Sequence, residues 1–236
     1  MNDNSMRKWL FESALIVISI LLAFAIQTWW EQVAESQQER QSLIGLKEEF
    51  ETNVASLRSS IDDYSENRKE ALKVLDLTNP SSRGDKNNET LLLLSQLIAT
   101  TETFEPVEGT LSYLVSSEGL GMLSNGELRL HLIQWPRAVS KINDRQTRIR
   151  EIMRQYFLPY IWTKIPVKVL DDIASSGLTN QTSSNSIDVS EMFSELEFQN
   201  IVNELLYSYT AEIEVLNDAL ALAETILGIV DDEIII

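Results

Sequence analysis

A long apolar segment near the amino end, Leu10 to Trp30, constrains this chain more than any other feature. From Ala14 to Ile26 it reads ALIVISILLAFAI, in which Ser19 is the only polar residue. As an α-helix, the 22 residues from Trp9 to Trp30 would span about 33 Å, which matches a hydrocarbon core of about 30 Å. Tryptophans at both ends favour the headgroup level of a bilayer. The segment therefore predicts one membrane-spanning helix.

Two other interpretations of this segment stay open. The tripeptide Ala23-Phe24-Ala25 fits the small-residue pattern at which a secretory signal peptide is cleaved. Against cleavage, Leu21 and Leu22 lead directly into the tripeptide, where a cleaved peptide usually has a more polar region. A buried core helix is the other alternative, and the flanking tryptophans argue against it.

Basic residues near the segment predict its orientation, because short loops rich in Lys and Arg stay in the cytoplasm. Arg7 and Lys8 precede the segment, whereas residues 31–46 contain Arg40 as their only basic residue. We therefore expect a cytoplasmic tail at 1–9, an anchor at 10–30, a polar stalk at 31–42 and a helical periplasmic domain at 43–236. This is the arrangement of a single-pass protein of the bacterial inner membrane.

Composition argues against several classes of site. The chain has no cysteine, so it can form neither disulfides nor thiolate metal sites, and its only histidine, His131, lies among apolar residues as a structural residue would. The formal net charge is −17, and fourteen Asp or Glu residues but no Lys or Arg follow Lys168. Because nucleic-acid binding requires a basic surface, we expect no nucleic-acid partner. We also expect no cofactor and no metal.

Two long helices are predicted at opposite ends of the domain. Residues 31–77 lack proline, and apolar residues recur there at steps of three and four, at Leu43, Leu46, Phe50, Val54, Leu57, Ile61 and Tyr64. The same spacing runs from Phe198 to Val230. Two such stripes favour an antiparallel pair, and a parallel coiled-coil oligomer of the first helix is the alternative. No stretch has the period of a strand, so we expect an all-α fold, a transmembrane helix followed by a bundle with long antiparallel, coiled-coil-like helices.

Shorter elements occupy the middle of the chain, where clusters of proline, glycine and asparagine mark the breaks. The expected order is a loop at 78–90, helices at 91–99, 110–115 and 127–135, a helix from 136 to about 164, a loop at 175–190 and a last helix from about 191 to 230. Pro136 would begin its helix because a first-turn residue needs no N–H donor, and Pro159 would kink the same helix.

Three segments together resemble a known family. The anchor ESALIVISILLAFAIQTWWEQ comes first, the middle carries TFEPVEGTLSYLVSSEGLGMLSNGELRLHLIQWP, and REIMRQYFLPYI follows. They are similar to an uncharacterised family of proteobacterial single-pass membrane proteins, over most of the chain up to about Ile161. The resemblance implies an inner-membrane anchor and a helical periplasmic domain, and it carries over no catalytic residue. From the residues alone, Leu128, Leu132 and Trp135 would pack inward in a helical hairpin rather than line a ligand pocket.

One region departs from the acidic trend. Arg137, Lys141, Arg145 and Arg148 follow one another at spacings of three and four, and therefore share one face of a helix. They could pair internally with acidic helices such as 48–63 or 204–218. The functional alternative is a docking stripe for an anionic partner.

The anchor contains a second candidate site. Glu12 is an acid inside the apolar segment, where a carboxylate is costly and indicates function. Ser19 and Ala23 have the small-xxx-small spacing that lets two membrane helices approach closely. These three residues are therefore candidates for contact with a partner's membrane helix. A local ion pair between Glu12 and Lys8 is the structural alternative.

Two functional classes follow from these features. The first is a membrane-anchored interaction or scaffold subunit of a bacterial envelope complex, bound to the bilayer and to a protein partner or to further copies of itself. The second is a periplasmic ligand-sensing helical domain that acts through a membrane partner, which the short tail at 1–9 disfavours because no output domain is present there. Acidic pairs such as Asp62-Asp63 lack the spacing of a calcium loop, so we do not expect an enzyme.

The orientation yields a first prediction. A periplasm-active reporter fused after Ile236 should be active, because the domain lies outside the cytoplasm, and the same reporter fused at Arg7 should be inactive. Activity measurements on both fusions test this. A cytoplasm-active reporter that works only after Ile236 would reverse the orientation and remove the envelope assignment.

Overall fold

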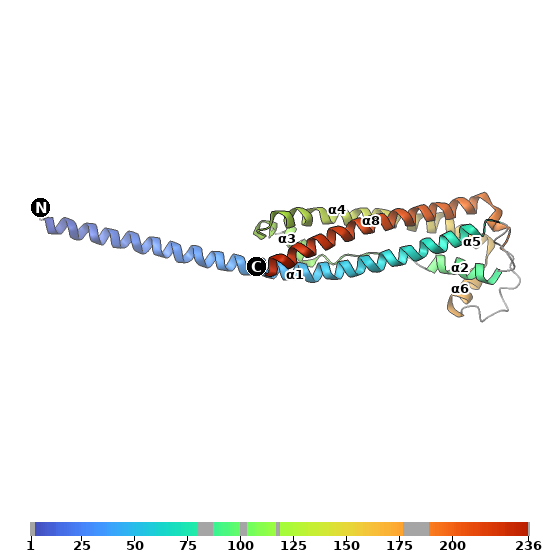
Figure 1. Ribbon diagram of the computed structural model, residues 1–236, viewed down its shortest axis with the longest axis horizontal. Coiled ribbons are helices and arrows are strands. Elements are labelled where there is room, and N and C mark those ends of the chain that lie inside the picture. Colours follow the sequence, from blue (N-terminus) through green and yellow to red (C-terminus); the bar gives the residue numbers. More distant parts are fainter. Residues whose placement is uncertain (1–2, 80–86, 100–102, 117–118, 177–188, 236) are drawn as a thin grey trace.

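The computed structural model describes residues 3–79, 87–99, 103–116, 119–176 and 189–235, and within these ranges every regular element is helical. The elements are α1 (Asp3–Asp76), α2 (Asn87–Ala99), α3 (Gly109–Ser116), η2 (Gly119–Met122), α4 (Gly126–Ile152), η3 (Met153–Phe157), α5 (Leu158–Lys164), α6 (Val167–Ser176), η5 (Met192–Ser194) and α8 (Leu196–Ile235). They form an elongated bundle from which α1 projects at one end (Figure 1). The predicted all-α class is confirmed.

Helix α1 is unbroken over 74 residues, a length of about 110 Å. Its amino-terminal part projects alone, and its carboxy-terminal part enters the bundle (Figure 1). By length and composition it is long and apolar enough to cross a membrane, and no part of its apolar window is buried. From Leu43 onward its apolar stripe is buried, beginning with Leu43 at 4% and Leu46 at 0% exposure.

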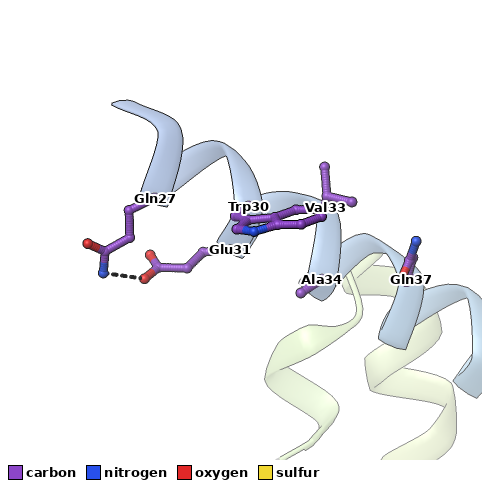
Figure 2. Close-up of a pocket in the computed structure, with 6 residues that line it drawn as sticks. All are labelled: Gln27, Trp30, Glu31, Val33, Ala34 and Gln37. Atoms are coloured by element: carbon purple, nitrogen blue, oxygen red, sulfur yellow. Dashed lines mark hydrogen bonds between the residues drawn. The ribbon is translucent and has the colours of Figure 1, made fainter. Parts of the chain in front are cut away.

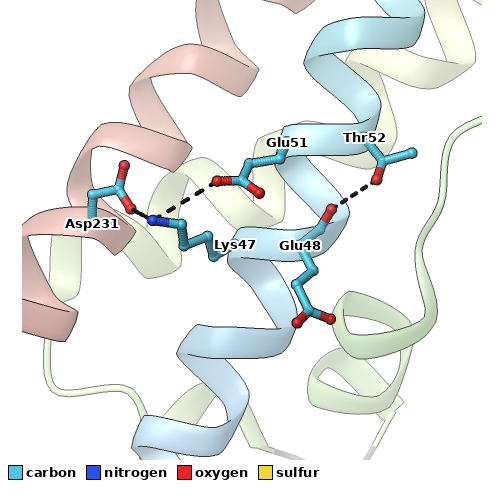
Figure 3. Close-up of polar contacts among 5 residues, drawn as sticks. All are labelled: Lys47, Glu48, Glu51, Thr52 and Asp231. Carbon is cyan, nitrogen blue, oxygen red and sulfur yellow. Dashed lines mark hydrogen bonds and ion pairs between the residues drawn. The ribbon is translucent and has the colours of Figure 1, made fainter.

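Helix α8 packs antiparallel along the buried part of α1. Near the base of the bundle, Lys47 Nζ lies 2.6 Å from Asp231 Oδ1 (Figure 3). Further from the base, Arg58 Nη2 lies 2.7 Å from Glu224 Oε1. Going from the first ion pair to the second, the residue number increases on α1 and decreases on α8. The two helices therefore run in opposite directions, as the two apolar stripes predicted. The C-terminus consequently returns to the point where α1 enters the bundle (Figure 1).

Helix α4 completes a three-helix core. Leu128, Leu132 and Trp135 are each 0% exposed, which confirms that they pack inward. The Trp135 ring meets the Phe50 ring of α1 edge-on, with centroids 5.1 Å apart. Phe104, from the segment before α3, meets the other side of the indole at 6.5 Å. Edge-to-face pairs of this kind add about 0.5–1.5 kcal/mol beyond the area that they bury.

Buried polar residues of α1 hold the segment 103–111 against the bundle. Asn53, 1% exposed, donates from Nδ2 to Val107 O at 2.9 Å and accepts from Val107 N at 2.8 Å. The Glu49 carboxylate accepts from the backbone N–H groups of Thr110 and Leu111 at the start of α3. A carboxylate there satisfies donors that have no partner within the helix and complements the helix dipole.

Gly45 makes this docking possible, because a Cβ atom at that position would lie 2.6 Å from Thr110 Oγ1. Below about 3 Å one of the two would have to move, so only glycine lets the start of α3 approach α1 this closely. The contact with Thr110, which lies 65 residues further along the chain, thus explains why the long helix has a glycine at this position.

Two expectations about the shorter elements are wrong, the helix start at Pro136 and the start of the last helix near residue 191. Pro136 lies inside α4 rather than at a helix start, because the fully buried residues on both sides hold the helical backbone against a cost of about 3 kcal/mol. The helical path reaches Lys164 as expected, and it passes through a π-helical turn, η3, just before Pro159. The last helix begins at Leu196, and helix α6 was not expected at all. Parts of the loops at 78–90 and 175–190 lie outside the described residues.

The antiparallel pair yields a second prediction. A zero-length carbodiimide should couple the Lys47 amine to the Asp231 carboxylate within one chain, because the two groups are 2.6 Å apart. Mass spectrometry of peptides from a mixture of isotopically light and heavy chains reads out the link. The matched control is Lys47→Arg, which keeps the charge but removes the reactive amine. Links that join light to heavy chains would mean that α8 packs on the α1 of another copy.

Candidate functional site

The basic stripe lies on the outer face of α4. Arg137, Lys141, Arg145 and Arg148 are all exposed. Arg148 Nη2 lies 2.9 Å from Glu204 Oε1 of α8, so the expected internal pairing holds for this residue. Within the described part of the chain, the other three make no ion pair. Three unpaired cations on a chain of net charge −17 form a local positive surface.

The stripe continues toward the base of the bundle as an apolar surface. Leu130 and Ile133 lie one to two turns before Arg137 and are 61% and 59% exposed. The outer face of α4 therefore combines large apolar side chains with cations. This composition is typical of an interaction surface rather than of a solvated helix face.

The anchor candidates have a simpler geometry. Ser19 donates from Oγ to the carbonyl of Leu15 at 2.8 Å, so its hydroxyl is satisfied within its own helix. Ala23 is exposed and lies one turn further along the same face. The side chain of Glu12 lies outside the described residues. No part of the chain that the structure describes covers Ser19 or Ala23, so both are open to a neighbouring helix.

A shallow hollow of about 500 Å³ marks the end of the apolar segment. Its lining residues, Gln27, Trp30, Glu31, Val33, Ala34 and Gln37, all belong to α1 (Figure 2). Gln27 Nε2 donates to Glu31 Oε1 at 3.0 Å along one side of it. A hollow on a single helix cannot enclose a ligand, because no second element faces it. It is a surface feature and not a binding pocket.

A buried polar layer, which was not predicted from the sequence, crosses the core between α1, α4 and α8. Glu212 is 0% and Gln146 1% exposed, and neither side chain makes a hydrogen bond of good geometry within the described residues. The Tyr209 hydroxyl is likewise buried without a partner there, and its ring lies 6.1 Å from that of Tyr64. The sequence contained one signal for this layer. Glu212 lies three residues after Tyr209, so it falls on the face of the helix that the apolar stripe buries.

Burial dominates the ionisation of this layer. It raises the pKa of Glu212 from an ordinary 4.5 to about 7, against the smaller opposing effects of Gln146 and the cations Arg145 and Arg150. The pKa of Tyr64 is raised by burial first and then by the charge of Glu212. Glu212 is therefore a core residue whose charge changes near neutral pH.

No further cluster suggests chemistry. His131 is partly buried, with Nε2 3.8 Å from the exposed Glu127 one turn earlier, an arrangement without a catalytic partner. No group of three or more His, Cys, Asp or Glu among the described residues is placed to hold a metal ion. The surfaces of α1, α4 and α8 are therefore the features from which function has to be argued.

Comparison of the chain with known protein families, with curated proteins and with solved structures finds no match.

The buried carboxyl yields a third prediction. Because its folded pKa is raised, native Glu212 binds a proton between pH 4.5 and about 7 that the unfolded chain has released. Its contribution to stability is therefore complete below pH 4.5 and is lost as pH rises through about 7. Thermal unfolding of the full chain, followed by circular dichroism, should show a loss of up to about 3 kcal/mol from pH 5 to pH 8 relative to Glu212→Gln.

The matched control for this experiment is Glu197→Gln on the same helix, where the carboxylate is exposed. This variant should follow the pH dependence of the parent chain. Equal pH dependence of the parent chain and of Glu212→Gln would show that the carboxyl does not titrate in the core.

Proposed function

We propose that this protein is a membrane-anchored interaction or scaffold subunit of a bacterial envelope complex. The observation that carries the proposal is the continuity of α1. One unbroken helix contains both an exposed apolar stretch long enough for a bilayer and the buried stripe of the bundle core. The bundle is thereby fixed to the anchor by a rigid rod rather than by a flexible linker. Such a construction holds binding surfaces at a set height and orientation.

The height follows from the geometry. Glu39 accepts a hydrogen bond from Ser124 N at 2.5 Å, so the base of the bundle lies at the level of this residue. Nine residues separate Trp30 from Glu39, a rise of about 14 Å. In the proposed arrangement, the bundle stands just above the headgroups on the periplasmic side of the inner membrane. Arg7 and Lys8 before the apolar segment support this orientation.

Ligand sensing is the second candidate, and the buried layer around Glu212 is the observation that favours it. A core carboxyl with a pKa near 7 would let the packing of α4 and α8 respond to the acidity of the compartment. The response would still have to reach a separate membrane partner through α1. The interaction role requires no such relay, and we therefore place it first.

The fourth prediction concerns the anchor. The full chain, purified in mild detergent after cross-linking in cells, should bring down one or more other envelope proteins at near-equal amounts by quantitative mass spectrometry. Glu12→Gln and Ala23→Leu should leave membrane insertion intact but reduce recovery of any partner held through membrane helices, because they remove a polar contact and close approach.

An unrelated single-pass protein with the same tag is the background control. Partners that survive both variants would be held by the bundle. If no protein exceeds the background and the chain does not associate with itself, the interaction role is wrong.

A further inference from the structure

Helices α4 and α8 carry complementary charges that the fold leaves unpaired. Lys141 and Arg137 are exposed on α4, and Glu214 and Asp218 are exposed on α8. None of these four forms an ion pair within the described ranges. The two helices are neighbours in the core and touch at the surface through Arg148 and Glu204.

Both sets of charges lie on the same face of the bundle. On α4, Arg137 and Lys141 belong to the stripe that ends at Arg148. On α8, residues at steps of three and four from Glu204 include Tyr207, Glu214 and Asp218, all exposed. The Arg148–Glu204 contact is therefore the boundary between a basic stripe and an acidic stripe that lie side by side.

The two stripes also match in level. Measured from the Arg148–Glu204 contact toward the base, Lys141 lies about 11 Å and Arg137 about 17 Å down α4 at 1.5 Å per residue. Glu214 lies about 15 Å and Asp218 about 21 Å down α8 by the same measure. Opposite charges therefore occur in the same order, with a level difference of about 4 Å that long side chains bridge.

The same face also carries uncharged exposed side chains. Tyr207 in the acidic stripe is 68% exposed, so nothing within the described residues covers its ring, and a guanidinium of a facing basic stripe can stack on it. Toward the base, α4 presents the exposed Leu130 and α8 the small exposed Ala221.

We propose that this face is the contact between two copies of the protein, related by a twofold axis along the membrane normal. The axis places the α4 stripe of one copy against the α8 stripe of the other, and it does so twice because the interface is isologous. Lys141 then faces Glu214 and Arg137 faces Asp218 of the other copy. The inference rests on the proposed function, because two chains with rigid α1 helices in one membrane present these stripes at equal height.

Anchoring in one membrane strengthens the association of two copies beyond what their surface charges contribute. An exposed ion pair contributes little to association, so a few pairs would not hold two free bundles together. Confinement to one membrane in one orientation raises the effective concentration of the second copy without any new contact. The apolar contacts at Leu130 and Ile133 add buried area at the base of the same face.

Anionic lipid is a poorer match to the stripe. Arg137 lies eleven residues beyond the α4 start, about 17 Å further from the membrane than the base of the bundle. Added to the rise from Trp30 to Glu39, this puts its level roughly 30 Å from the end of the apolar segment. The Debye length is about 8 Å at physiological ionic strength, so headgroup charge does not reach the stripe.

Charge reversal tests the contact in the full chain. One variant carries Arg137→Glu and Lys141→Glu, and the other carries Glu214→Lys and Asp218→Lys. In nanodiscs or mild detergent, each variant alone should dissociate at least about tenfold more readily than the parent chain, because like charges then face each other. An equal mixture of the two variants should recover the dimer, because both halves of the twofold contact become complementary in the heterodimer. Mass photometry or light scattering gives the oligomeric state, and circular dichroism verifies the fold.

Cysteine pairing tests the same contact by proximity rather than by charge, and the chain has no cysteine of its own to interfere. A chain with Lys141→Cys and a differently tagged chain with Glu214→Cys, expressed together, should form a disulfide-linked heterodimer on mild oxidation. The matched control replaces Glu214→Cys with Thr52→Cys on the exposed face of α1, and this pair should not link.

The outcomes separate this inference from the proposed function. A parent chain that is monomeric in nanodiscs, or a reversed pair that fails to recover the dimer, overturns the twofold contact. If other envelope proteins still co-purify with the chain in that case, the interaction role stands. If those partners are lost from the Arg137→Glu, Lys141→Glu variant while the oligomeric state is unchanged, the stripe serves a different protein and the contact between copies is wrong.

Discussion

The unbroken backbone of α1 is the constraint on which the rest of this structure depends. A single helix leaves its apolar stretch bare at one end and buries its apolar stripe in the bundle at the other. The main elements of the bundle are positioned against that buried stripe or against the helices that cover it. α8 lies along it, α4 closes the core through Trp135, and the segment 103–111 is fixed by Asn53 and Glu49. Changing the direction of α1 would therefore move the whole bundle with respect to the anchor.

Periodicity explains why the main architecture was predictable from the sequence. Apolar residues at steps of three and four define which face of α1 and of α8 is buried, and two such faces in one chain satisfy each other when the helices are antiparallel. The inward packing of Leu132 and Trp135 follows from the same rule. These properties depend only on the spacing of residues along one segment, so they can be recognised without knowing which other segments pack against it.

What could not be predicted depends on contacts between distant residues. A proline at position 136 normally begins or breaks a helix, and only the buried rings packed around Trp135 keep α4 continuous through it. Glu49 and Asn53 read as surface residues of a charged helix, yet they are buried because the backbone of 103–111 supplies their partners. For the candidate site, the sequence identified the basic stripe but not its state of pairing, since that depends on where Glu204 lies.

The buried Glu212 shows how this core departs from a purely apolar design. A well-packed hydrophobic residue of similar size at that position would often be neutral or stabilising, so stability does not explain a carboxyl there. A polar group in a helical core instead penalises alternative registers, because any slip of α8 would place the carboxyl against a fully apolar surface. Its neighbours support this role, since Gln146 on α4 and the Tyr209 hydroxyl on α8 form the one polar layer described between these two helices.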